Sequence, residues 1–428
     1  MPSLPNSEAL APNQHQTSTL ALIAGFFFSF RAFIMVLSVR LLGTDPQTGT
    51  AISLIAGMLL LFLVAFCCLA RRARSFREMT RTSGVRWSLV YLALSCLSLL
   101  WSDTSSLPIA IVYWAGMAAD FVVVALMLRA RTASIVAPSL MKGYVWGACL
   151  GAAVAWLLPA QSDLRLGDEE LLGPNNIAYP LAIAFLFAQF LMRKRLGNWT
   201  LPAAFLGITV LRSLSKTTIL ALLAAQALLL IADRSMKRRT KVLLVGFVVL
   251  VFLVFSALIV SYWDIYLNAG NQSETLSGRL GIWAYFLVEG FQKPWFGHGF
   301  NSVWGVVPPF GPDRFEAAHA HNEIIQQFYA YGALGVSTFI GYYASLYRHI
   351  RKLASAKMRV FLYATLLFFL IRGLADTERF DLSLPIWAGL LFSEIIEHER
   401  SAYREQGDTA AESKLGPASE LEGFPGFA

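Results

Sequence analysis

Residues 51–70 read AISLIAGMLLLFLVAFCCLA and contain no charged side chain. A helix needs about 20 predominantly apolar residues to cross the roughly 30 Å hydrocarbon core of a bilayer. Lipid satisfies no backbone polar group, so such a run crosses the bilayer as an α-helix. The stretch therefore predicts a membrane-spanning helix.

Similar apolar runs recur along the whole chain. Hydrophobic residues make up 56% of the 428 positions, and charged residues make up 14%, against about 25% in soluble domains. The mean hydropathy is +0.55. The sequence predicts an all-α, polytopic bundle of about twelve spans: 20–42, 50–70, 87–101, 108–128, 140–158, 174–192, 199–212, 214–232, 242–262, 321–347, 358–374 and 382–397.

Basic residues follow every second predicted span. Residues 1–19 contain no Lys or Arg, so we expect no cleaved signal and a cytoplasmic tail at 1–19. Cytoplasmic loops are enriched in Lys and Arg, which predicts an inner-membrane protein with both termini in the cytoplasm. This topology also explains the net charge of +8 without a nucleic-acid partner. The basic loops lie at 71–81, 129–131, 193–195, 234–241 and 348–357.

One connection on the outer side is long. It covers residues 263–320, between spans one to nine (20–262) and spans ten to twelve (321–397). Within it, Leu280–Gln292 has apolar residues at helical spacing, which predicts a helix on the membrane surface. Long ordered loops are often functional. Residues 398–428 are polar and predict a disordered cytoplasmic tail.

Cations near the outer ends of the spans are the first candidates for chemistry, because a charge in a membrane is costly unless it is paired or used. Arg212 and Lys216 flank the turn between spans seven and eight. They either hold an anionic substrate or extend to the headgroups. Arg279 lies at the start of the predicted surface helix, where free N–H groups already favour an anion such as a diphosphate.

Histidines and further polar groups form a second set. His319 and His321 precede span ten, and a histidine there is suited to accept a proton from a sugar hydroxyl. An i, i+2 pair without a nearby Cys or acidic cluster is a poor metal site, so we expect no metal. Two alternatives stay open elsewhere. Arg372 and Asp376 are either substrate-binding or a structural ion pair, and Asn175 and Asn176 either cap a helix or bind a sugar.

Several motifs resemble the O-antigen ligase and polysaccharide polymerase (Wzy-type) family of bacterial membrane glycosyltransferases. The most specific is His321-Asn322, followed after nine residues by Gly332 and then Gly335. Residues 277–283 (SGRLGIW) and 295–300 (WFGHGF) resemble the family's loop signatures. Weaker similarity occurs at 101–103, 173–176 and 214–217. The forms around Lys216 and Arg372 are closer to exopolysaccharide polymerases.

The resemblance implies a periplasmic site that acts on an undecaprenyl-diphosphate-linked glycan without a cofactor. The implied reaction is inverting, metal-independent polymerisation of repeat units into exopolysaccharide or O-antigen. Alternatives are a ligase that transfers glycan to lipid A core and, from another class, a lipid-linked glycan flippase. Membrane lipid and a chain-length regulator are the other implied partners. The implied roles are catalytic for His321 and Arg279, and substrate-binding for Lys216, Arg212, His319, Asn322, Arg372 and Asn176.

Overall fold

The computed structural model describes residues 12–70, 75–158, 165–167, 171–232, 237–239, 241–243, 246, 276–310, 316–377 and 382–414. Every regular element in these ranges is a helix, as predicted. Within them, six helices are long and apolar enough to cross a membrane. They are α1 (Pro12–Leu42), α2 (Pro46–Cys68), α5 (Leu107–Ala130), α6 (Ala133–Leu157), α7 (Pro174–Arg193) and α14 (Ala356–Ala375).

The remaining helices complete a multi-pass bundle but do not confirm twelve spans. They are α3 (Phe76–Met79), α4 (Ser83–Ser98), α8 (Thr200–Arg212), α9 (Lys216–Ala232), α12 (Leu276–Gln292), α13 (Glu323–Arg351) and α15 (Ile386–Lys414). The 13 residues of α8 extend about 20 Å, so the α8–α9 hairpin is shorter than a full crossing. Predicted span nine, 242–262, lies outside the described residues except at 242, 243 and 246.

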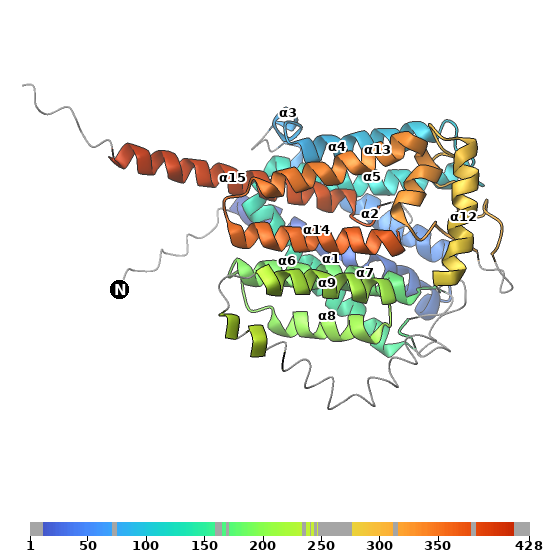
Figure 1. The fold of residues 1–428 in the computed structure, drawn as a ribbon, viewed down its shortest axis with the longest axis horizontal. Helices are drawn as coiled ribbons and strands as arrows, with labels where there is room; N and C mark the ends of the chain where they lie inside the picture. The colour runs from blue at the N-terminus through green and yellow to red at the C-terminus, as the bar shows by residue number, and fades with distance from the viewer. Residues whose placement is uncertain are drawn as a thin grey trace, which may run out of the picture.

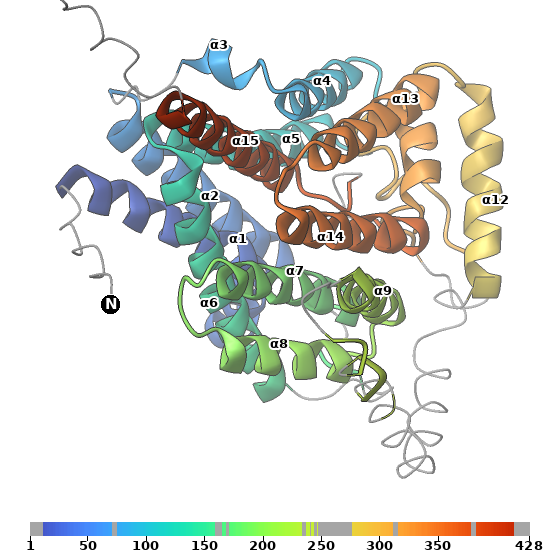
Figure 2. The same ribbon diagram turned by 60° about the vertical axis from the view of Figure 1, so that its left-hand side comes forward.

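The long helices lie side by side, and α12 runs across one end of the bundle (Figure 1). A view turned by 60° shows α12 beside the ends of α13 and α14 (Figure 2). Inside the bundle, α1 packs closely against α6. A Cβ atom at Gly143 of α6 would lie 1.8 Å from the carbonyl oxygen of Leu22, so only glycine permits this approach.

Helices extend into both predicted tails. Helix α1 begins at Pro12 rather than at residue 20, since proline is well tolerated in the first turn of a helix. Helix α15 continues to Lys414, where a disordered tail from 398 was predicted. The polar segment is rich in Glu, Arg and Ala, which favour helix. An ion pair between Arg400 and Glu397 (3.0 Å) adds local support.

Predicted span ten is not one continuous helix. Helix α13 is broken at Gly332, which has φ 61° and ψ −150°, a conformation that residues with a Cβ atom rarely adopt. A Cβ atom there would also lie 2.4 Å from the backbone of Trp295. The glycine of the His-Asn motif therefore allows the helix to break and another segment to approach.

The approaching segment is the loop 293–305, which follows α12. It provides partners for the backbone groups that the break removes from the helical ladder. The bonds run from His298 N–H to Tyr329 O (2.9 Å), from Gly299 N–H to Ala330 O (2.7 Å), from Ala333 N–H to Pro294 O (2.8 Å) and from Leu334 N–H to Trp295 O (3.4 Å). Two of the sequence signatures thus interlock, and they fix α12 against α13.

Candidate functional site

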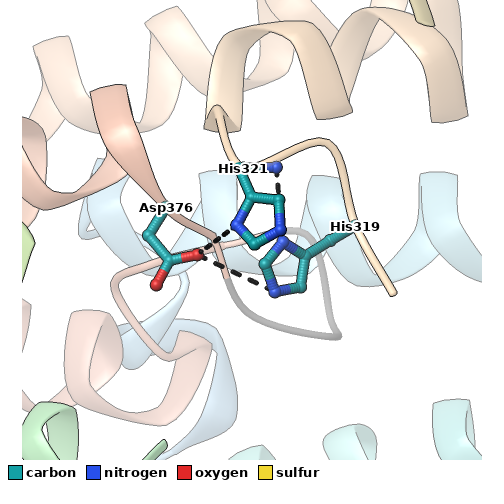
Figure 3. A group of neighbouring side chains, drawn as sticks. All are labelled: His319, His321 and Asp376. Carbon is teal, nitrogen blue, oxygen red and sulfur yellow. Dashed lines mark hydrogen bonds and ion pairs between the residues drawn. The ribbon is translucent and has the colours of Figure 1, made fainter. Parts of the chain in front are cut away.

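A histidine and a carboxylate from neighbouring helix ends form the centre of the site. His321 lies two residues before α13, and Asp376 directly follows α14. Nδ1 of His321 lies 3.2 Å from Oδ1 of Asp376 (Figure 3). An ionised carboxylate only accepts hydrogen bonds, so Nδ1 carries a proton, and in the neutral ring the lone pair is then on Nε2. The pair has the arrangement of a general base oriented by a carboxylate.

Asp376 is held in its ionised form. Burial alone would raise its pKa, but the positive charge of Arg372 and the hydrogen bond from His321 outweigh burial. The pKa of Asp376 therefore lies well below its usual range. The aspartate thus remains a hydrogen-bond acceptor for His321 at neutral and mildly acidic pH.

The backbone at His321 has an unusual conformation, which hydrogen bonds of the next residue, Asn322, stabilise. His321 has φ 53°, in the left-handed region that non-glycine residues rarely occupy. Asn322 caps α13 by accepting the N–H groups of Ile324 (3.0 Å) and Ile325 (3.1 Å). Its Nδ2 also donates to the carbonyl oxygen of Leu374 (2.9 Å). The predicted substrate-binding role of Asn322 remains untested, and the contacts give it a part in joining α13 to α14.

His319 has the opposite hydrogen-bonding pattern. Its Nδ1 accepts the backbone N–H of His321 at 3.3 Å, so in the neutral ring the proton sits on Nε2. That nitrogen lies 3.8 Å from Oδ1 of Asp376. Burial is the main cause that lowers the pKa of His319 to about 3, and the neighbouring positive groups, including Arg372 and Arg279, act in the same direction against the opposing charge of Asp376. His319 is therefore neutral at pH 7.

Two arginines lie against this cluster. Arg279, the fourth residue of α12, donates through Nη1 to the carbonyl oxygen of Ala375 at the end of α14. Nη2 of Arg372 lies 3.4 Å from Oδ2 of Asp376, and its guanidinium lies 3.9 Å from the ring centre of Tyr179. Only 1% of Arg372 is exposed. Its position thus favours the structural alternative for the Arg372–Asp376 pair over direct contact with a substrate.

Ligand atoms of His319, His321 and Asp376 lie within 4.8 Å of one another, which is close enough for a metal site. The donor set is unfavourable for one. The Nε2 atom of His319 that faces Asp376 carries the ring proton, since Nδ1 is engaged by a backbone N–H. The arginines beside the cluster add positive charge. The chemistry of these residues supports proton transfer better than metal binding.

The other predicted cations lie on the α8–α9 turn. Arg212 ends α8, Lys216 begins α9, and both are half-buried. Leu214 between them has φ 56°, a strained conformation of the kind that clusters at functional sites. Helix α9 packs along α14, the helix that ends at the cluster.

The turn is connected to the start of α7. Ser215 Oγ donates to Oδ1 of Asn175 at 2.7 Å. Neither predicted asparagine caps the helix, because Gly173 is the N-cap and makes no side-chain cap bond. Asn176 is exposed, and its predicted sugar contact remains a proposal.

Sequence reasoning missed the partner of His321. The sequence pairs Asp376 only with Arg372, because a separation of 55 positions from His321 gives no spacing signal. Tyr179 was also missed. Its ring lies against Arg372, and its hydroxyl donates to the carbonyl oxygen of Ser383.

The low pKa of His319 has a consequence for stability. An unfolded histidine binds a proton below about pH 6.5, whereas folded His319 does so only below about pH 3. Between these values the unfolded state binds more protons, so stability falls as the pH falls. We expect His319→Gln to lose less thermal stability than wild type between pH 7.5 and pH 5, measured by melting in detergent. His349→Gln, at the far end of α13, is the control, and an equal loss in the His319 variant would contradict the buried neutral state.

Comparison with protein families agrees with the motifs. Residues 201–340 match the O-antigen ligase family, which confirms the predicted resemblance and indicates a glycosyl-transferring membrane enzyme. The matched region includes Arg212, Lys216, Arg279, His319 and His321, whereas Arg372 and Asp376 lie beyond it. No curated protein matches the chain.

Proposed function

We propose that this chain, which carries an O-antigen ligase-type region, polymerises undecaprenyl-diphosphate-linked repeat units by an inverting, metal-independent glycosyl transfer. The observation that carries the proposal is the ionised Asp376 at 3.2 Å from His321, with Arg279 bonded to the preceding residue. A base oriented by a carboxylate beside a cation matches the needs of a reaction that removes a hydroxyl proton and expels a diphosphate.

The reaction needs one proton transfer and one displacement. The acceptor hydroxyl oxygen attacks the anomeric carbon, and its proton passes to Nε2 of His321. The bond between that carbon and the diphosphate oxygen breaks, and the diphosphate leaves with the electron pair. Attack opposite the leaving group inverts the anomeric centre. Asp376 stabilises the imidazolium that forms.

Arg279 is the cation best placed for the leaving group. A guanidinium has five N–H donors in a planar fork, and Nη1 of Arg279 donates to the carbonyl oxygen of Ala375. Developing negative charge on the diphosphate is stabilised by such a fixed cation. Arg212 and Lys216 on the half-buried α8–α9 turn are proposed to hold the lipid-linked substrate.

Charge at the helix ends supports a periplasmic site. Helix α13 begins beside His321 and has Arg348 and Arg351 in its last turn. Helix α7 likewise ends at Arg193. The basic ends of these helices favour the cytoplasm. The site lies at their other ends, which supports a position on the periplasmic side.

A ligase is the second candidate, because the matched family is described as O-antigen ligase. A flippase receives less support. Transport would use charged groups within the spans, but Arg31 in α1 pairs with Asp120 in α5, so its charge is compensated within the bundle.

The test is transfer by the purified protein in the presence of EDTA. With a native lipid-linked repeat unit alone, a polymerase forms a ladder of products. A ligase forms product only when an acceptor such as lipid A core is added. Absence of both products, together with passage of the lipid across liposomes, would replace the enzyme proposal with transport.

Asp376→Asn tests the role of the carboxylate. The asparagine amide would donate to Nδ1 of His321 and move the ring proton to Nε2, which removes the base. Because the base is lost, we expect kcat to fall by a factor of about 10² to 10⁴. Arg372→Gln/Asp376→Asn removes both buried charges, so that no unpaired cation destabilises the fold. Full activity of this double variant would contradict the assignment.

A further inference from the structure

A second charged cluster lies where the loop 293–305 meets the α4–α5 turn. Oδ2 of Asp103 lies 2.5 Å from Nζ of Lys293 and 2.7 Å from Nδ1 of His298. The backbone N–H of Asp103 donates to the carbonyl oxygen of His298 at 2.9 Å. Only 8% of the His298 side chain is exposed. The cluster connects the end of α12 to the turn between α4 and α5.

Both ring nitrogens of His298 face acceptors. Nδ1 faces the Asp103 carboxylate, and Nε2 lies 3.1 Å from the carbonyl oxygen of Glu289. A carbonyl oxygen cannot donate, and a neutral imidazole has only one N–H group. Burial would raise the pKa of Asp103, but the bonds from Lys293 and His298 outweigh it and lower the pKa, so the carboxylate also only accepts. Both contacts are satisfied together only when the ring carries two protons.

The surroundings favour this positive charge. Glu289 is one of the last four residues of α12, whose carbonyl groups have no partner within the helix. The end of a helix carries partial negative charge, so a cation there is stabilising. The ring also stacks on Tyr329 at a centroid distance of 4.4 Å and an angle of 17°. Lys293 is the other cation on Asp103, and the negative charges of Asp103 and Glu289 both act on Tyr329, the residue whose ring stacks on His298.

We propose that His298 is an imidazolium at neutral pH and a positioning residue for Arg279. Its two N–H groups join Asp103 to the C-terminal end of α12, so the helix that carries Arg279 keeps its place across the end of the bundle. The charge state rests on the geometry of the cluster and on the ionised carboxylate of Asp103, and it does not depend on the reaction. The link to Arg279 rests on the proposed glycosyl transfer.

The charge state is measured first, by ¹⁵N-histidine NMR of the full chain in lipid nanodiscs at pH 7. We expect a signal from a histidine with both ring nitrogens protonated that is absent from His298→Gln. Asp103→Asn should abolish the doubly protonated signal, whereas Lys293→Met should retain it. A singly protonated His298 in the wild type would overturn the proposal whether or not any variant folds.

The positioning role is measured by a double-mutant cycle on transfer. We expect His298→Gln to lower kcat by about 10- to 100-fold with KM nearly unchanged. In an Arg279→Ala background, His298→Gln should not lower kcat further, because there is then no guanidinium to position. Losses that multiply would overturn this role. Absence of transfer in the wild type would instead sink the proposed function and leave the NMR result standing.

Discussion

Replacing His321 with alanine is expected to lower the rate of glycosyl transfer by a factor of about 10² to 10⁴, the usual contribution of a positioned general base. The reason is that Nε2 of His321 acts as the base. The ring is held in place because Nδ1 donates a hydrogen bond to Asp376. KM for the lipid-linked repeat unit should change little, because the cations are left in place. Initial rates over a range of substrate concentrations separate these two constants.

The control for this variant is His349→Ala. His349 lies in the last turn of the same helix, and its Nδ1 contacts the carbonyl oxygen of Ser345 at 2.8 Å. It therefore tests the loss of a histidine from α13 without touching the site. Near-wild-type transfer by His321→Ala, in protein that melts like wild type, would remove His321 from the catalytic role. Equal losses in both variants would point to the fold instead.

Hydropathy predicts most of the helices because length and apolar content decide which segments cross a bilayer. Predicted spans at 108–128 and 174–192 lie within two residues of α5 and α7 at each end. The break in α13 could not be predicted in this way. A single glycine in an apolar run is compatible with a helix, and the loop that fills the break comes from a separate part of the chain.

The charged residues show the same limit. Individual cations and histidines stood out because charge is rare in the spans, but their partners did not. The carboxylate of Asp376 meets His321 only through the ends of α13 and α14. His298 meets Asp103 only when the loop after α12 reaches the α4–α5 turn. The sequence therefore predicts which side chains take part, whereas their protonation states follow only from the tertiary contacts.

Arg279 gives the second large effect. Arg279→Ala is expected to lower kcat by about 10² to 10³, the cost of removing one donor from a developing negative charge. The kcat of Arg279→Lys should lie between those of wild type and Arg279→Ala, because lysine keeps the charge but loses the planar fork of the guanidinium. The ratio of the two losses therefore separates charge from bidentate geometry. It is read from kcat for the lipid-linked repeat unit.

Leu280→Ala is the matched control, because Leu280 is the next residue of α12 and its side chain is 57% exposed. A general weakening of the helix would affect all three variants, whereas loss of leaving-group stabilisation affects only the two at Arg279. If Arg279→Ala changes only the melting temperature, then the guanidinium acts through its bond to Ala375, and the diphosphate must be stabilised elsewhere. The cations of the α8–α9 turn would then be tested next, because Lys216 begins the helix that packs along α14.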